Sequence, residues 1–211
     1  KGKVAWITGG KRIGQEVAAT LAELGADLVV SYRSSRKEAE KISNALVLQC
    51  DVGDRESVAK AVQEIEKKFG KLDILILLAS IFKSVKVEKI EDKDWDANFA
   101  THVKGSFWPI QLSLPLMVPG SHIVTISDRT ALGRIYAGHL PYVVTKSAVA
   151  AMTRALAVEL GPKGIFINSI APGPVLKPDD ISDVEWQEIR NQSFIKYPLT
   201  DEEAVQEFVD T

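Results

Sequence analysis

The chain contains one cysteine, three histidines and no long apolar run, and each scarcity excludes a class of protein. A lone Cys50 in an apolar segment indicates a buried, reduced thiol, not a disulfide framework or a catalytic cysteine. The histidines lack metal-ligand spacing to one another or to Cys50, so we expect no metal site. No apolar stretch reaches the about 20 residues that span a bilayer, and the first residues lead straight into a strand, which leaves no room for a signal peptide. These absences predict a cytoplasmic protein without a membrane partner.

An excess of charge of one sign is also lacking. The chain carries 26 lysines and arginines against 28 aspartates and glutamates, a formal net charge of −2, and its basic residues form no long run. This balance excludes the electrostatic footprint of a nucleic-acid-binding protein. Its 211 residues, 45% of them hydrophobic, suffice for one sizeable core but not for two domains. We expect a single domain over residues 1–211 that acts on a small-molecule substrate.

Short apolar runs alternate with helical patterns, which is typical of βαβ units. The alternation predicts an α/β fold with a doubly wound, mostly parallel sheet. The predicted strands are 4–8, 27–32, 45–50, 72–78, 122–127 and 164–170, and the predicted helices are 14–24, 35–44, 55–69, 94–117, 142–160 and a last one from 201. We expect Ser35 to cap the second helix and Pro109 to kink the fourth. Residues 174–200 break the pattern and are expected to form the substrate loop.

A glycine-rich turn, Thr8-Gly9-Gly10-Lys11-Arg12-Ile13-Gly14, follows the first predicted strand. Glycines let backbone N–H groups approach a pyrophosphate, and the N-terminus of the next helix supplies positive potential. An ordinary strand-to-helix turn is the alternative, but the position directly after the first strand favours a dinucleotide cofactor.

The end of the second strand indicates which dinucleotide is bound. A carboxylate there would bind a ribose 2′-hydroxyl and repel a phosphate. The chain instead has Tyr32, Arg33 and Ser34, with Lys11 and Arg12 in the glycine turn. An arginine clamps a phosphate with charge-assisted hydrogen bonds. The pattern favours NADP(H) over NAD(H), although Arg33 as a solvated loop charge stays open.

Tyr142 and Lys146 are four residues apart near the start of a predicted helix, so they share one face. A free tyrosine has a pKa of about 10, and a neighbouring ammonium is expected to lower it toward the working range. Tyr142 would then protonate the atom that becomes negative when a nicotinamide gives hydride to a carbonyl or imine carbon. Ser127 or Asp128, at the end of a strand, would orient the substrate, unless they simply end the strand in a turn.

With these features together, the sequence resembles the short-chain dehydrogenase/reductase family over essentially its whole length. The resemblance rests on residues 8–14, 50–52, 77–80, Tyr142-x-x-x-Lys146 and 170–175. It implies a doubly wound sheet, a nicotinamide cofactor with Lys146 also on its ribose, and a homo-oligomer, a tetramer or a dimer. The further cofactor contacts that it implies are Asp51, Val52, Ala79, Ser80, Pro172, Gly173 and Val175.

The chain also departs from the family pattern. The glycine turn is one residue shorter than usual, and Leu77 and Leu78 replace two asparagines. His102 replaces an active-site asparagine, where it would relay protons or simply pack. Arg129 occupies the usual serine position, thirteen residues before the tyrosine, so one extra loop residue is needed to bring Asp128 or Ser127 there. The family's last strand has no counterpart in these 211 residues.

Within the family, residues 79–82 and Ser127-Asp128 are similar to pteridine reductases. There an aspartate replaces the serine, and a phenylalanine stacks on the flat pterin ring. The similarity implies a substrate site of Phe82, Asp128 and Tyr142. An aspartate suits C=N reduction, whereas a serine suits a ketone.

Three functions follow from these observations. The first is an NADPH-dependent reductase of a carbonyl or a pterin-like C=N group. The second is a 3-oxoacyl-type or sugar-type carbonyl reductase that uses Ser127. The third is a catalytically weak dinucleotide-binding sensor, which the lost asparagines and the short turn favour. Tyr142 and Lys146 argue against the sensor, because it needs neither.

Overall fold

The computed structural model describes residues 2–131, 133, 135, 137–177, 182–191, 203 and 206. They divide into two compact units, Lys1–Ala171 and Pro172–Thr211. The first unit carries the sheet, and the second carries one described helix, α7 (Asp183–Asn191).

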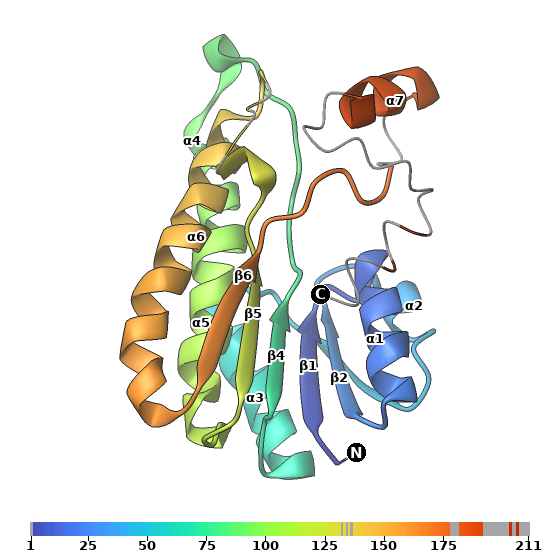
Figure 1. The fold of residues 1–211 in the computed structure, drawn as a ribbon, viewed down its shortest axis with the longest axis vertical. Helices are drawn as coiled ribbons and strands as arrows, with labels where there is room; N and C mark the ends of the chain where they lie inside the picture. Colours follow the sequence, from blue (N-terminus) through green and yellow to red (C-terminus); the bar gives the residue numbers. More distant parts are fainter. Residues whose placement is uncertain are drawn as a thin grey trace. The chain divides into compact units, whose positions relative to one another are not determined.

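The first unit is built on a six-stranded sheet whose neighbouring strands all pair in parallel (Figure 1). The sheet order is β3-β2-β1-β4-β5-β6, so successive strands are added in one direction from β1 to β3 and in the other direction from β4 to β6. This topology confirms the predicted doubly wound parallel sheet. The strands are β1 (Val4–Thr8), β2 (Asp27–Tyr32), β3 (Ala45–Gln49), β4 (Ile74–Leu77), β5 (His122–Ile126) and β6 (Phe166–Ile170).

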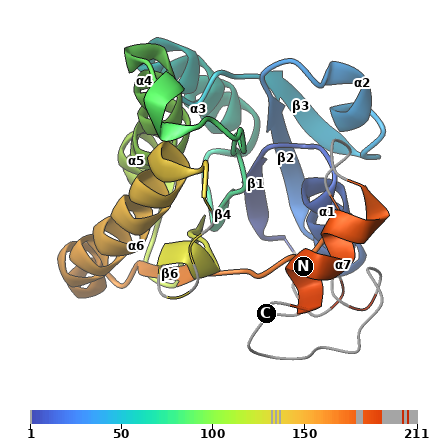
Figure 2. The same ribbon diagram turned by 90° about the horizontal axis from the view of Figure 1, so that it is seen from above.

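Helices cover both faces of this sheet: α3, α5 and α6 lie on one face and α1 on the other (Figure 2). The core fills the space between the sheet and its helices with side chains such as Trp6, Ile65, Leu75 and Ile123. The helices are α1 (Ile13–Glu23), α2 (Arg36–Ala39), α3 (Arg55–Phe69), α4 (Asp92–Asn98), α5 (Gly105–Ser113) and α6 (Leu140–Leu160). None of them, within the described part of the chain, has the length and apolarity that crossing a bilayer demands.

Three helix predictions are corrected. The helix predicted over 35–44 is only the four residues of α2, and the Ser35 side chain makes no capping hydrogen bond. The long helix predicted over 94–117 is α4, a π-helical turn at Phe99–Lys104, and α5. The helix type therefore changes before Pro109, and Pro109 itself lies inside α5. Helix α7 lies in the segment expected to be a loop, and the helix predicted from 201 falls almost entirely outside the described residues.

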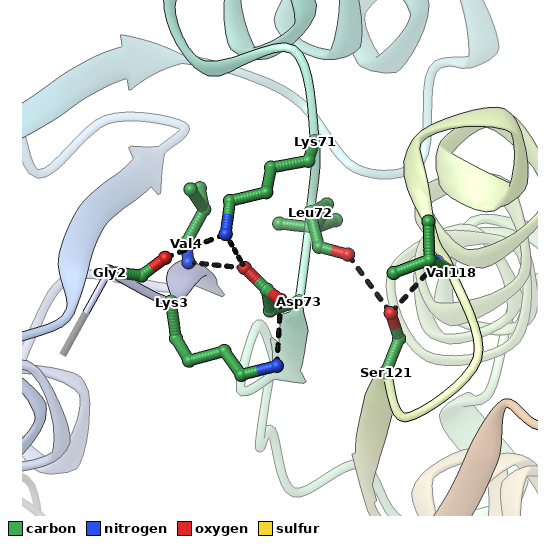
Figure 3. A network of polar contacts seen from close by, with 8 residues as sticks. All are labelled: Gly2, Lys3, Val4, Lys71, Leu72, Asp73, Val118 and Ser121. Atoms are coloured by element: carbon green, nitrogen blue, oxygen red, sulfur yellow. Dashed lines mark hydrogen bonds and ion pairs between the residues drawn. The ribbon is translucent and has the colours of Figure 1, made fainter.

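A buried carboxylate joins β1 to β4 at their amino ends, opposite the edge that carries the candidate site (Figure 3). Asp73 accepts hydrogen bonds of 2.9 Å from the Lys3 ammonium and the Val4 N–H, and Lys71 lies 2.9 Å from its second oxygen. Burial alone would raise the pKa of Asp73, but the hydrogen bonds from Lys71, Val4 and Lys3 outweigh it and lower the pKa to about 2. Figure 3 also shows the Ser121 hydroxyl, which joins Leu72, just before β4, to Val118, in the turn before β5.

Candidate active site

The glycine turn meets the end of β4 where the sheet order reverses. The Thr8 carbonyl accepts the Leu78 N–H at 3.1 Å, and the Thr8 hydroxyl accepts the Ala79 N–H at 3.3 Å. Gly9 has a φ of 89°, and a Cβ on it would lie 3.1 Å from the Ala79 nitrogen. Ligands bind at this kind of switch point in open parallel sheets. The structure thus brings Thr8, Gly9 and Ala79 together at the expected edge.

The glycine turn is one residue shorter than the family pattern, and a non-glycine residue, Arg12, adopts a positive φ in it. Arg12 takes a φ of 57° and a ψ of −119° just before α1, a conformation that L residues rarely adopt and that costs about 1–3 kcal/mol. A Cβ on Gly14 would lie 2.0 Å from the Gly9 carbonyl oxygen, and one on Gly10 would lie 2.4 Å from the Val30 side chain. Glycine is therefore required at both positions for packing. The Gly14 and Gln15 N–H groups donate to the Lys11 and Arg12 carbonyls at 3.2 and 2.9 Å. The positive potential of the N-terminus of α1, together with the glycines that let the backbone approach, is therefore what fits a pyrophosphate here.

The residues predicted to select NADP(H) lie at the same edge. Arg33 and Ser34 are exposed directly after β2, and Lys11 and Arg12 are exposed after β1, which pairs with β2. Tyr32, the last residue of β2, is buried. Three cations and no carboxylate follow these two adjacent strands, an arrangement that suits a phosphate better than a ribose hydroxyl.

Hydrogen bonds hold the segment after β3 in place, and its contact with a cofactor stays a prediction. Asp51 accepts the Gly53 N–H at 2.9 Å, and its own N–H donates to the Ser57 hydroxyl at 3.0 Å. The Val52 side chain is buried in the core, so only its backbone is available to a cofactor. Cys50 is buried and free, as predicted, and burial raises its pKa to about 11.

Asp128 forms the central contact of the site: it accepts a hydrogen bond of 2.7 Å from the Tyr142 hydroxyl. The other carboxylate oxygen accepts the Thr130 N–H at 2.8 Å, which fixes the orientation of Asp128. Ser127 is 2% exposed, and its hydroxyl donates to the Ile170 carbonyl at 3.2 Å. Of the two candidates at the end of β5, the structure brings Asp128 to the tyrosine and turns Ser127 toward β6.

Lys146 lies under the tyrosine ring. Its ammonium donates to the Ile126 carbonyl at 2.8 Å and lies 5.7 Å from the centroid of the Tyr142 ring. The side chain is 3% exposed, and burial lowers its pKa to about 8, although Asp128 acts in the opposite direction.

The pKa of Tyr142 is shifted in the direction opposite to our expectation. Burial raises it, and the charge of Asp128 and the hydrogen bond to that carboxylate raise it further. Lys146 does not outweigh these effects in this structure. Tyr142 is therefore held firmly in its protonated form.

Three rings surround the Tyr142 ring at steep angles. Phe82 meets it edge-on with centroids 4.9 Å apart, and His102 does so at 5.5 Å. His139, which sequence reasoning missed, stacks on Phe82 with centroids 4.2 Å apart and planes 9° apart. Phe82 is 51% exposed, so it is not simply a core residue. The only signal for His139 was its position directly before the helix that carries Tyr142.

Three other predicted contacts, Pro172, Gly173 and Val175, belong to the second unit. Their contact with a cofactor stays a prediction. Within that unit, Lys177 pairs with Asp183 at the start of α7, and Trp186 is buried. Among the described residues of the whole chain, no group of histidine, cysteine and acidic side chains is arranged to hold a metal ion.

Comparison with known proteins assigns this architecture to a family. The family described as enoyl-(acyl carrier protein) reductase matches residues 9–210. Versicolorin reductase 1 of Aspergillus parasiticus is 34% identical over 183 residues, which are 82% of this chain and 70% of that protein. The 3-oxoacyl-acyl-carrier-protein reductase of Staphylococcus aureus is 30% identical over 207 residues, which are 93% of this chain and 83% of that protein.

The chain belongs to the short-chain dehydrogenase/reductase family. Solved structures agree. A short-chain dehydrogenase/reductase from Serratia marcescens superposes with a TM-score of 0.89 at 29% identity, over 99% of this chain and 89% of that one. A short-chain dehydrogenase from Burkholderia cenocepacia, in complex with NADP, gives 0.88 at 28% identity over the same shares.

Membership in this family confirms the resemblance and the oxidoreductase class. It disfavours the sensor, because this short-chain dehydrogenase/reductase keeps Tyr142, Lys146 and an acidic partner in contact. The narrower similarity to pteridine reductases stays a prediction.

Proposed function

We propose that this short-chain dehydrogenase/reductase uses NADP(H) to reduce a C=N bond in a flat, nitrogen-containing ring, with Tyr142 as the proton donor. The observation that carries the proposal is the 2.7 Å hydrogen bond from the Tyr142 hydroxyl to Asp128, beside the half-exposed ring of Phe82. A carboxylate at this position suits a substrate ring that contains nitrogen. It can accept a hydrogen bond from an N–H of that ring and so orient the C=N bond.

The cofactor would be held along the carboxyl edge of β1, β2 and β4. The turn at Gly9 and Gly10 and the N-terminus of α1 fit its pyrophosphate, and Lys11, Arg12 and Arg33 fit a 2′-phosphate. The NADP complex of the Burkholderia relative supports this choice. When bound, the reduced nicotinamide supplies the hydride.

The side chains of this chain supply the proton and the positioning. Tyr142 Oη holds the proton that the substrate nitrogen takes as the carbon accepts hydride, so C=N becomes CH–NH. Lys146 stabilises the phenolate that remains, because its buried ammonium lies 5.7 Å from the ring centroid. Asp128 holds the hydroxyl in place through its 2.7 Å hydrogen bond.

Two aromatic groups favour a flat substrate. The exposed part of Phe82 offers a ring for stacking, while His139 covers one of its faces.

A second candidate function is carbonyl reduction on a 3-oxoacyl or related substrate. The names of the Staphylococcus and Aspergillus relatives favour it. The same Tyr142 proton would go to a ketone oxygen, and Asp128 would replace the serine that such an enzyme ordinarily uses. Ser127 itself is less suited, because its hydroxyl is buried against Ile170.

The test is NADPH oxidation by the parent and by Asp128→Ser with a dihydropterin, a quinone, a 1,2-diketone and a 3-oxoacyl thioester. We expect the parent to reduce the dihydropterin. Asp128→Ser should lose that activity by at least about tenfold, the scale of one charged hydrogen bond, while it keeps or gains activity on the diketone. Asp96→Ser, at an exposed aspartate of α4, is the matched control and should behave as the parent.

A parent that reduces the thioester or the diketone but not the dihydropterin would replace the first function by the second. A parent that oxidises NADPH with none of the four compounds would contradict both. Two further expectations accompany the proposal: assembly into a homo-oligomer, a tetramer or a dimer, and a cytoplasmic location.

A further inference from the structure

His102 is the most deeply buried titratable side chain near Tyr142, with 1% of its surface exposed. It lies in the π-helical turn Phe99–Lys104 between α4 and α5. π-Helical turns are rare and frequently occur at functional sites. The mechanism above does not use this imidazole, although its ring meets the Tyr142 ring edge-on at 5.5 Å.

The hydrogen bonds of His102 determine which ring nitrogen carries the proton. The Ile81 N–H donates to Nε2 at 3.2 Å. A backbone N–H can only donate, so Nε2 is the unprotonated nitrogen of the ring. A neutral imidazole then carries its proton on Nδ1, which lies 2.8 Å from the Thr145 hydroxyl and donates to it. The Ser80 hydroxyl, 3.0 Å from Nε2, donates as well.

The Thr145 hydroxyl continues the chain of hydrogen bonds into the first turn of α6. Because it accepts from Nδ1–H, its own proton is free to donate to the Pro141 carbonyl at 2.9 Å or to the Tyr142 carbonyl at 3.0 Å. Every donor in the chain thus has an acceptor, and the direction is the same throughout. The imidazole joins the segment after β4 to the helix that carries the tyrosine.

We propose that His102 is a positioning residue. In its neutral Nδ1–H form, Nδ1 positions the proton donor Tyr142, and Nε2 positions the segment that leads to Phe82 in the proposed substrate site. The Nδ1 arm acts through Thr145 on the backbone of Tyr142. The Nε2 arm acts on Ser80 and Ile81, which directly precede Phe82.

Each arm therefore has its own kinetic signature. Loss of the Nδ1 arm loosens Tyr142 relative to Asp128 and should lower kcat. Loss of the Nε2 arm loosens Phe82 and should raise KM. It should also weaken NADPH binding, because Ser80 is one of the predicted cofactor contacts. Burial and the charge of Lys146 lower the pKa of His102 to about 3, so the ring keeps this neutral form over the working range.

Four substitutions test the two arms separately. His102→Asn places an amide N–H near the position of Nδ1 and has no acceptor at Nε2, whereas His102→Gln places an amide oxygen near Nε2 and loses the donor at Nδ1. Thr145→Val removes the hydroxyl at nearly constant volume, and Thr145→Ser restores it. His122→Asn, at an exposed histidine of β5, is the matched control.

We expect His102→Gln and Thr145→Val to lower kcat by about tenfold with KM nearly unchanged, and Thr145→Ser to recover most of the loss. His102→Asn should raise KM and the Kd of NADPH by about tenfold with a smaller effect on kcat. Asn and Gln variants that change kcat and KM alike would overturn the proposal, and so would a failure of Thr145→Ser to recover kcat.

The kinetic part rests on the proposed function and uses whichever of the four compounds the parent reduces. The spectroscopic part does not. Long-range proton–nitrogen spectra of the parent, labelled with ¹⁵N-histidine, report the protonated ring nitrogen, and His122→Asn and His139→Asn identify the other two histidines. We expect His102 to give the neutral Nδ1–H pattern without change from about pH 5 to about pH 8. An Nε2–H pattern, or titration near the ordinary histidine pKa of about 6.5, would overturn the proposal even if the parent reduces no compound.

Discussion

Lys146 is predicted to weaken the fold that carries it, and Lys146→Met tests this. Methionine has a similar length and volume but no charge. The pKa of the buried ammonium is lowered from 10.5 to about 8, so keeping it charged in the native state costs about 3 kcal/mol at pH 7. Its hydrogen bond to Ile126 offsets part of this cost. We expect the variant to exceed the parent by about 1–3 kcal/mol in free energy of unfolding.

The prediction also fixes how the free energy of unfolding changes with pH. The pKa of Lys146 is lower in the folded state than in the unfolded state, so the unfolded chain binds more protons between about pH 8 and pH 10.5. The parent's free energy of unfolding therefore rises in this window, by about 2 kcal/mol from pH 7 to pH 9.5 for this group. Lys146→Met lacks the rise, so its advantage shrinks.

The assay is urea denaturation of the parent, Lys146→Met and Lys67→Met at both pH values. Lys67 is an exposed lysine of α3, and its substitution should change the free energy of unfolding by less than about 0.5 kcal/mol. Lys146→Met should also lose turnover. A Lys146→Met variant that is less stable than the parent at pH 7, by an amount independent of pH, would refute the reasoning.

The remaining predictions concern the two ends of the sheet. Asp73→Asn should lower the free energy of unfolding by about 2 kcal/mol at pH 7. The parent should lose this contribution as the pH falls from about 4 through about 2, which acid denaturation measures. A parallel decline in the variant would contradict the role assigned to Asp73. Arg33→Ala should weaken NADPH binding by about 1–3 kcal/mol, the scale of a charged hydrogen bond, and NADH binding little. Titrations of tryptophan fluorescence measure both, and an equal loss for the two cofactors would count against a phosphate contact.

Much of the fold was predictable because parallel strands are buried on both faces and appear in the sequence as short apolar runs. The bounds of α3 were predicted to the residue, since Asp54 accepts the Glu56 N–H at its start and Gly70 ends it with a φ of 66°. The π-helical turn was not predictable, because the apolar pattern continues across Phe99–Lys104 while the hydrogen-bond register changes.

The structure brings Tyr142, Asp128 and Phe82 together, but the electrostatics around them were not predictable from the sequence. Counting back from Tyr142 left Asp128 and Ser127 equally open, and only the path of the loop after β5 distinguishes them. The pKa of Tyr142 was predicted in the wrong direction because sequence spacing gives the distance to Lys146 but not the degree of burial. His139 was missed because its stacking on Phe82 joins segments far apart in the chain.

The central claim is that Tyr142 donates the proton in an NADPH-dependent reduction, and Tyr142→Phe tests it most directly. The substitution removes the hydroxyl that donates to Asp128 and little packing volume. NADPH oxidation with the compound that the parent reduces best should fall by at least about 100-fold, the usual contribution of a general acid. The Kd of NADPH should stay within about threefold, less than the loss of one hydrogen bond. Turnover of Tyr142→Phe equal to that of the parent would contradict the account.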